Sequence, residues 1–384
     1  MPARRGERIP PFIVMEVLEK AIQMGREGHD IIHMEVGEPD FDTPRCVKEA
    51  AWRAMLEGET HYTHSLGLHE LREAISAHYR EKYAVEVDPE RIIVTSGSSP
   101  AMLLLFAALL DPGDEVILSN PCYACYPNIV EFVDGVPVEV PVFEEEGFQY
   151  RPRDIERRLC ERTRAVIINS PSNPTGNLLE PEVMEEIAAL SGRGLYVVSD
   201  EIYHGLVYER REHSVLEFTD RAFVINGFSK LYAMTGWRLG YLIAPEEYVR
   251  PIQKMQQNLF ISANAFVQRG GIAALTEAGE EVAAMVRTYD ERRRFLLPRL
   301  RELGFGVAVE PHGAFYILAN ARAFTDDSYS FALELLERAH VAVTPGIDFG
   351  SGAEGFIRFS YANRLENLAE GVRRLGEYLE GRRS

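Results

Sequence analysis

Asn226-Gly-Phe-Ser-Lys-Leu-Tyr-Ala-Met-Thr-Gly-Trp-Arg-Leu-Gly240 holds a lysine, Lys230, between two apolar runs, Ala222 to Ile225 and Tyr241 to Ala244. Because such runs predict buried strands, we expect Lys230 at a strand end and not on a solvated face. A desolvated amine loses part of its preference for the charged form and can then attack an aldehyde. Arg238 follows, and its guanidinium suits a phosphate. A lysine that forms a Schiff base, followed by a phosphate-binding arginine, indicates pyridoxal 5'-phosphate (PLP).

Short apolar runs alternate with helix-length segments from about Pro44 to Leu275. Runs that are apolar throughout indicate strands buried on both faces, and helices between them are typical of a mostly parallel sheet. The sequence therefore predicts an α/β fold with helices covering the sheet. The predicted strands are Ile92–Thr95, Glu115–Leu118, Ala165–Ile168, Leu195–Val198, Phe223–Ile225 and Leu239–Ala244.

The pattern changes after about Glu280. Apolar runs at Phe315–Leu318, Val341–Val343 and Phe356–Phe359 stand between amphipathic helical patterns, which predicts a smaller α+β domain. We expect the N-terminal segment, with a helix from about Val14 to Arg26, to join it. The predicted division is a large PLP-binding domain at 45–280 and a small domain made of 1–44 and 281–384.

Composition excludes several classes of protein. The 41 basic and 59 acidic residues give a net charge of -18, which disfavours a nucleic-acid partner. No apolar stretch approaches the roughly 20 residues of a membrane span, and the first residues lack the apolar core of a signal peptide. Four cysteines are too few for a disulfide scaffold of this length. We therefore expect a cytoplasmic protein with no membrane partner.

The stretch from Ser229-Lys230 to Gly236-Trp-Arg238-Leu-Gly240 resembles the cofactor-lysine signature of the fold-type I PLP enzymes. This is the aspartate-aminotransferase superfamily, and the resemblance is strongest to its class I/II aminotransferases. It runs from about Gly37 to Ser360, with the motifs in the family order. It implies that Ser229, Lys230 and Arg238 bind the cofactor.

A candidate phosphate site lies in Thr95-Ser-Gly-Ser-Ser-Pro100, which leads into an apolar helix. Free amides and the positive end of a helix dipole suit an anion, although plain helix capping would explain the same residues. The resemblance to the family's phosphate loop implies that Gly97, Ser98 and Ser99 bind the phosphate, chiefly through their backbone. Pro100 departs from the usual motif, but a first-turn proline is tolerated because no helical hydrogen bond is lost.

Three further motifs follow predicted strands. Read alone, they could be a core aromatic, a turn and a structural ion pair. The resemblance implies that Tyr123 stacks on the PLP ring, that Asn173 of Asn173-Pro-Thr-Gly176 bonds the phenolic oxygen and that Tyr203 assists there. Asp200 would pair with the protonated ring nitrogen, which makes the ring an electron sink. Lys230, Asp200 and Tyr203 are the predicted catalytic residues.

The substrate side is defined by fewer residues. The resemblance implies that Arg358 of Phe356-Ile-Arg-Phe-Ser360 binds the substrate carboxylate with its bidentate fork, although a solvated edge arginine would fit the same pattern. Gly37 and Asn173 are the other predicted substrate contacts. Tyr62 matches a tyrosine that reaches the phosphate across a dimer interface, so we expect a homodimer with active sites at the interface.

The sequence also contains a misleading metal pattern. Pro121-Cys122-x-x-Cys125 together with His33-Met-Glu35 spells a zinc-deaminase signature, but its halves lie far apart and His33 falls outside the predicted sheet. We therefore expect no metal.

The function implied is a transaminase that moves an amino group from an L-amino acid to a 2-oxo acid. We expect ping-pong kinetics through a Schiff base on Lys230. A PLP-dependent lyase, such as a C–S β-lyase, would use the same residues, and a PLP-binding regulatory module is a remote alternative that the acidic charge disfavours. The amino donor stays open, because no motif provides a basic partner for a distal carboxylate; Arg26, His29, His64 and Arg322 are candidates by residue type only.

Overall fold

The computed structural model describes residues 3–383. Its centre is a seven-stranded sheet of strand order β2-β8-β7-β6-β5-β3-β4. All neighbouring strands run parallel except β8, which is antiparallel to both β2 and β7. The strands are β2 (Ile92–Thr95), β3 (Glu115–Asn120), β4 (Val136–Pro141), β5 (Thr163–Asn169), β6 (Tyr196–Asp200), β7 (Ala222–Gly227) and β8 (Gly240–Ile243). The predicted α/β class and mostly parallel sheet are confirmed.

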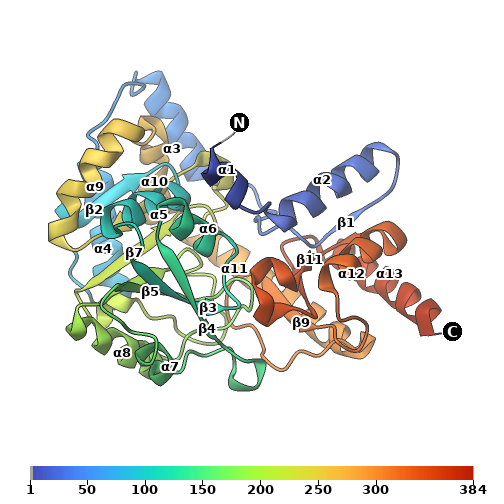
Figure 1. Ribbon diagram of the computed structural model, residues 1–384. Helices are drawn as coiled ribbons and strands as arrows, with labels where there is room; N and C mark the ends of the chain where they lie inside the picture. Colours follow the sequence, from blue (N-terminus) through green and yellow to red (C-terminus); the bar gives the residue numbers. More distant parts are fainter. Residues whose placement is uncertain (1–2, 384) are drawn as a thin grey trace.

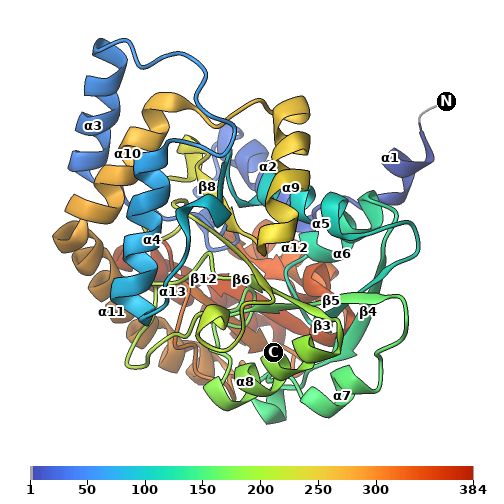
Figure 2. The same cartoon turned by 90° about the vertical axis from the view of Figure 1, so that its left-hand side faces the viewer.

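Helices cover both faces of this sheet (Figure 2). In β5, Ala165 and Ile167 pack into the core under one helical layer, whereas Val166 and Ile168 pack into the core under the other. This is why the strand sequence is apolar throughout and does not alternate. One layer contains α5 (Ser98–Leu109), α6 (Cys125–Phe132) and α9 (Glu246–Leu259), and the other contains α4 (His69–Tyr83), α8 (Pro181–Ala189) and α10 (Ala265–Glu277).

The remaining helices near the sheet are α3 (Arg45–Leu56), which packs on α10, the short α7 (Pro152–Glu156), and α11 (Gly279–Leu303). A short helix α1 (Arg4–Arg8) precedes them in the chain. No helix among residues 3–383 has both the length and the apolar character needed to cross a membrane.

A second region contains a three-stranded antiparallel sheet, β11-β12-β9, and a parallel pair, β1-β10. Its elements are α2 (Ile13–Arg26), β1 (Ile32–His33), β9 (Tyr316–Asn320), α12 (Ser328–Glu334), a π-helical turn (Leu335–Ala339), β10 (Val341–Ala342), β11 (Thr344–Pro345), β12 (Phe356–Ser360) and α13 (Leu365–Arg383). α2 and β1, drawn in blue, lie beside the red C-terminal elements (Figure 1). This arrangement supports our proposal that 1–44 and 281–384 form one small domain, and 45–280 the large one.

One strand of the seven-stranded sheet lies outside the sequence prediction. β4 contains Pro137 and Pro141, and prolines argue against a strand because they cannot donate to the ladder. β4 is tolerated because it is the last strand of the sheet and pairs only with β3.

Candidate active site

A cavity of about 380 Å³ opens at the carboxyl ends of the parallel strands. Ligands in open α/β sheets bind at this edge, because the loops that follow the strands converge there. The structure brings together most of the predicted site residues around the cavity: Gly37, Ser98, Ser99, Tyr123, Asn173, Asp200, Tyr203, Ser229, Lys230, Arg238 and Arg358.

Lys230 follows β7, and its Nζ points into the cavity. The ammonium donates a hydrogen bond of 2.6 Å to the carbonyl oxygen of Gly37. Burial lowers the pKa of Lys230 to about 8, against the opposing effect of Glu38. About a tenth of this amine is therefore neutral, and nucleophilic, at pH 7, far more than for an ordinary lysine.

Asp200 is the last residue of β6 and is buried. Its Oδ2 accepts a hydrogen bond of 2.7 Å from the Tyr126 hydroxyl, and its Oδ1 accepts one of 3.1 Å from the Ile202 amide. Burial raises the pKa of Asp200 to about 6. Within residues 3–383 no basic side chain forms an ion pair with it, and the charge of Lys230 opposes the effect of burial only in part, so a cationic ligand group at the carboxylate would relieve its desolvation cost.

An anion cradle forms where α5 begins. Gly97 precedes the helix with φ of 99°, and Ser98 and Ser99 occupy its first turn, where amides lack helical partners. A Cβ built on Gly97 would lie 2.5 Å from Nη2 of Arg238, so the guanidinium packs directly on this backbone. Free amides, a helix dipole and a guanidinium thus meet at one point.

Arg358 lies on β12 and is 3% exposed. Its Nη1 donates to Oδ1 of Asn173 at 2.7 Å, and its Nη2 donates to the carbonyl oxygen of Glu35 at 2.6 Å. The side chain also lies over the ring of Tyr316, with 4.3 Å from Cζ to the centroid. The Nε atom is buried without a partner in the described structure. Arg358 is therefore held rigidly in the cavity and keeps an N–H donor, at Nε, for a ligand. It is not a solvated edge residue.

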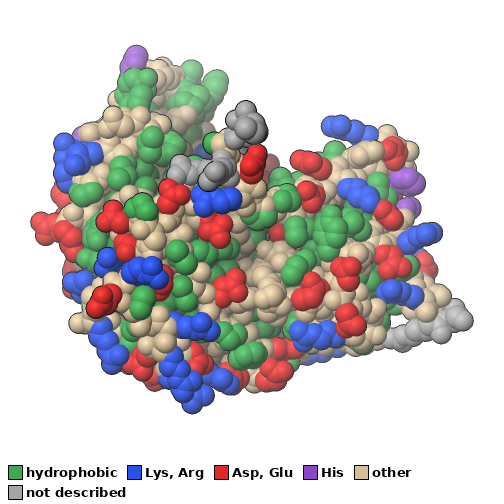
Figure 3. Space-filling model, viewed as in Figure 1, with side chains coloured by type: hydrophobic (Ala, Val, Ile, Leu, Met, Phe, Trp, Pro, Cys, Tyr) green, Lys and Arg blue, Asp and Glu red, His purple; other side chains and the backbone are tan. Residues whose placement is uncertain are grey.

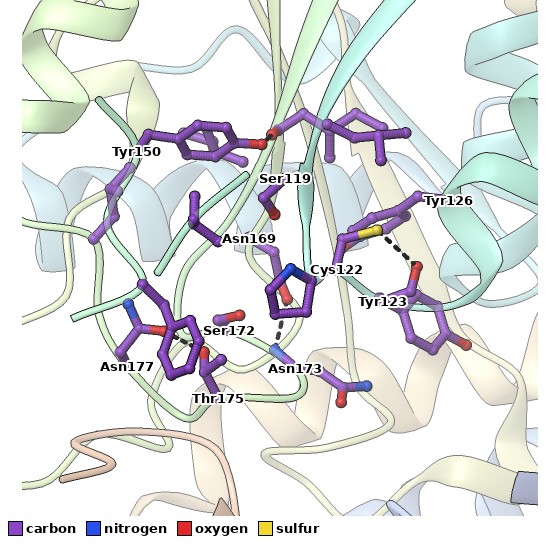
Figure 4. Close-up of a pocket in the computed structure, with 17 residues that line it drawn as sticks. Ser119, Cys122, Tyr123, Tyr126, Tyr150, Asn169, Ser172, Asn173, Thr175 and Asn177 are labelled. Atoms are coloured by element: carbon purple, nitrogen blue, oxygen red, sulfur yellow. Dashed lines mark hydrogen bonds between the residues drawn. The ribbon is translucent and has the colours of Figure 1, made fainter. Parts of the chain in front are cut away.

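Tyr123 and Asn173 line both the main cavity and a smaller one of about 30 Å³, whose lining residues are drawn in Figure 4. The Asn173 amide donates to Oδ1 of Asn169 at 2.8 Å, which fixes the loop. The smaller cavity is too small for a cofactor.

Two tyrosines of the site were not predicted. Tyr126 bonds Asp200, as described above, and the hydroxyl of Tyr316 lies 2.7 Å from that of Tyr203. Tyr316 also explains Gly37, because a Cβ there would overlap the Tyr316 hydroxyl. Tyr126 could have been suspected because it lies three residues after Tyr123 in the same loop segment, whereas Tyr316 has no local signal beyond its place in an apolar run.

Tyr62 does not line the cavity of its own chain. Its side chain is 80% exposed and belongs to the loop between α3 and α4. His33, part of the misleading metal pattern, instead bonds Glu35 through Nδ1 at 2.7 Å. Within the described chain, no three His, Cys, Asp or Glu side chains are grouped as a metal site would require.

The sequence of this chain is similar to those of known proteins. The sequence matches the family Aminotransferase class I and II over residues 29–375. The (5-formylfuran-3-yl)methyl phosphate transaminase of Methanocaldococcus jannaschii is 41% identical over 384 residues, covering 99% of this chain and 100% of that protein. The aspartate/prephenate aminotransferase of Thermus thermophilus is 41% identical over 382 residues, covering 98% of each.

The chain belongs to the class I and II aminotransferases.

Solved structures agree with this assignment. The aspartate aminotransferase of Thermus thermophilus with maleate has a TM-score of 0.95 at 40% identity, over 98% of this chain and 99% of that one. A Methanococcus jannaschii protein, described as similar in its active site to kynurenine aminotransferases, has a TM-score of 0.91 at 41% identity, over 99% of this chain and 100% of that one. The resemblance inferred from the sequence is confirmed, and this enzyme is a PLP-dependent transaminase.

The residues of this aminotransferase fit PLP. No basic side chain among the described residues forms an ion pair with the buried Asp200, and a protonated ring nitrogen would supply that partner. The Gly97 and Arg238 cradle suits the phosphate and has no room for a Cβ at position 97. Lys230, with its lowered pKa, lines the same cavity.

Proposed function

We propose that this aminotransferase works by a ping-pong mechanism in which Lys230 Nζ binds the PLP aldehyde covalently. The observation that carries the proposal is the convergence of a low-pKa lysine, an unpaired buried aspartate, an anion cradle and a buried arginine on one cavity. Each group has a distinct partner in the reaction, and together they match the needs of one cofactor and one amino acid.

The chain's own residues divide the work. Bound PLP supplies an electron sink for the charge that develops at the substrate Cα. Asp200 would accept a hydrogen bond from the ring nitrogen and would favour its protonated form. Arg358 binds the substrate α-carboxylate with its fork, oriented by Asn173. Lys230 Nζ, displaced by the substrate amine, accepts the Cα proton as general base.

The remaining cofactor contacts are proposed on the same basis. Gly97, Ser98, Ser99 and Ser229 would bind the phosphate together with Arg238, Tyr123 would stack on the ring, and Tyr203 would bond the phenolic oxygen. Tyr203 is positioned for this by Tyr316. Gly37 accepts the Lys230 hydrogen bond and would border the substrate.

We also propose a homodimer in which Tyr62 of one subunit completes the phosphate site of the other. Large apolar side chains are exposed around it: Trp52 is 60% exposed, Leu56 69% and Leu259 60%. The loop with Tyr62 lies beside the end of α9, because the Thr63 amide donates to Ser262 Oγ at 3.3 Å. Exposed apolar surface of this kind is typical of an interface.

A cytoplasmic enzyme with small-molecule partners is proposed as well. The cysteines Cys46, Cys122, Cys125 and Cys160 are all free, which suits a reducing compartment. On the face drawn in Figure 3, basic and acidic side chains are intermixed, which is unlike the basic surface that a nucleic acid needs.

A half-reaction tests the proposed function. PLP-loaded enzyme mixed with one amino acid, and no oxo acid, should release one equivalent of 2-oxo acid per site and no ammonia, with loss of the visible absorption of the cofactor. Added 2-oxo acid should restore that absorption. Continuous release of pyruvate and ammonia without an acceptor would instead identify a lyase.

A further inference from the structure

One wall of the active-site cavity is apolar, and none of the roles above uses it. Lys230 and Arg358 belong to the polar wall of the same cavity. The wall is formed by the start of α2 together with one residue each from α5 and α6: Phe12, Val14, Met15, Leu18, Met102 and Ile129. Since the α-amino and α-carboxylate groups of a substrate engage the polar wall, its side chain must find room elsewhere in the same cavity.

The apolar wall is held in place. The carboxylate of Asp348 accepts hydrogen bonds from the amides of Ile13 at 3.0 Å and Val14 at 3.3 Å, which satisfies the first turn of α2. The ring of Phe12 packs edge-on against Tyr123, with 6.2 Å between centroids. Phe12 therefore connects α2 to the residue proposed to stack on the cofactor.

The basic side chains of the cavity already have partners in the proposed mechanism. Among the described lining residues they are Lys230, Arg238 and Arg358, proposed to bind the aldehyde, the phosphate and the α-carboxylate. The sequence candidates for a distal carboxylate, Arg26, His29, His64 and Arg322, are all outside this lining.

Carboxylates lie near the apolar wall, and the cation whose charge reaches Asp348 there is Arg358, which already has the substrate α-carboxylate as its proposed partner. Glu38 lines the cavity, and Asp348 lies at the start of α2, where Glu16 adds to the negative charge around it. A second carboxylate on a substrate would lose its hydration here and meet carbon atoms and like charges.

We infer that the preferred amino donor has an apolar side chain, aromatic or large aliphatic, and that the wall of α2, Met102 and Ile129 receives it. The inference rests on the proposed function. It assigns this chain a different donor from the one for which its aspartate aminotransferase relatives are named.

Ligand binding tests the inference without turnover. The PLP-loaded enzyme is titrated calorimetrically with 3-phenylpropionate and with succinate, which share one carboxylate and differ in carrying a phenyl ring or a second carboxylate. We expect 3-phenylpropionate to bind at least about tenfold more tightly, since its ring is buried on the apolar wall. Equal affinities, tighter binding of succinate, or no detectable binding of 3-phenylpropionate would overturn the inference. Tighter binding of succinate would mean that a cation from outside this lining reaches the cavity.

A pair of variants on one helix locates the contact. Leu18→Lys places a cation in the wall and should lower the preference for 3-phenylpropionate over succinate at least about tenfold. Ile22→Lys places the same charge one turn further along α2, at an exposed position outside the lining, and should leave the preference unchanged. The same result for both variants would show that the wall does not contact the ligand and would overturn the assignment.

Single turnovers separate this inference from the proposed function. L-phenylalanine should convert the cofactor faster than L-aspartate at equal concentration. A preference for aspartate would overturn the donor inference alone, whereas failure of every amino acid to convert the cofactor would overturn the proposed function and the inference with it.

Discussion

At the scale of single residues, burial changes the acidity of the two central groups in opposite directions. It lowers the pKa of Lys230 to about 8 and raises that of Asp200 to about 6, because a buried site disfavours the charged form of either group. The lysine thereby becomes a better nucleophile, and the aspartate gains most from a cationic partner.

The lowered pKa of Lys230 predicts how the apoenzyme captures PLP. Only the neutral amine attacks the aldehyde, so the capture rate should rise about tenfold per pH unit below pH 8 and level off above about pH 9. Stopped-flow absorbance from pH 6 to 10 measures this, with the reaction of PLP and Nα-acetyl-lysine as the reference for the cofactor's own titration. The ratio of the enzyme rate to the reference rate should be constant below pH 8 and fall above it, because the reference amine has an ordinary lysine pKa. A ratio that stays constant up to pH 10 would mean that Lys230 has an ordinary lysine pKa as well.

Sequence reasoning identified these residues because their chemistry conflicts with their surroundings. A charged residue within or at the end of an apolar run requires a partner. This is the position of Lys230, Asp200 and Arg358 in the sequence, and all three line the cavity. Tyr126 and Tyr316 were not predicted, because a tyrosine in a loop or in an apolar run does not conflict with its surroundings. Their roles depend on which neighbours folding brings within reach.

At the scale of elements, the site depends on where helices and strands end. The start of α5 combines a glycine of positive φ, unpaired amides and the guanidinium of Arg238. Arg238 itself ends a short turn and has a φ of 54°. Gly97 serves two purposes here: it adopts a conformation that side chains rarely allow, and it leaves space for the guanidinium.

Gly97→Ala should therefore weaken PLP binding through crowding as well as strain. The added Cβ would displace the Arg238 guanidinium, so we expect the Kd for PLP to rise at least about tenfold. Gly113→Ala is the matched control: Gly113 also has positive φ, of 88°, but a Cβ there meets nothing within 4 Å. It should cost about 1 kcal/mol of stability and leave the Kd unchanged. Equal Kd values for the two variants would contradict the cradle.

The elements themselves could largely be predicted from apolar periodicity. The observed bounds of β2 equal the predicted ones, and α2 begins one residue earlier than predicted. β4 could not, because its two prolines carry the opposite signal and only its place at the sheet edge makes them acceptable. The reversal of β8 also has no sequence signal, since a buried strand looks the same in either direction.

At the scale of the whole molecule, large apolar side chains near Tyr62 are left exposed in the single chain. Trp52 and Leu56 lie on α3, and Leu259 lies at the end of α9. A second copy covering them would bring Tyr62 to the neighbouring active site, so assembly and cofactor binding should be coupled.

Charge in this patch should separate the subunits. Leu56→Glu combined with Leu259→Glu is expected to give a monomer by light scattering and to raise the Kd for PLP, because Tyr62 no longer reaches a second site. Val136→Glu, at an exposed position on the edge strand β4, is the control and should change neither property. A wild-type protein that is monomeric at micromolar concentration would contradict the proposed dimer.

The central claim is that Lys230 is the residue that binds the cofactor covalently. Reduction of the PLP-loaded enzyme with borohydride, followed by proteolysis and mass spectrometry, tests it most directly. We predict that the mass of the reduced cofactor is found on the peptide containing Lys230 and is lost in Lys230→Ala, while Lys254→Ala, an exposed control, keeps it. A label on another lysine, or no label on any peptide of the wild-type enzyme, would contradict the account.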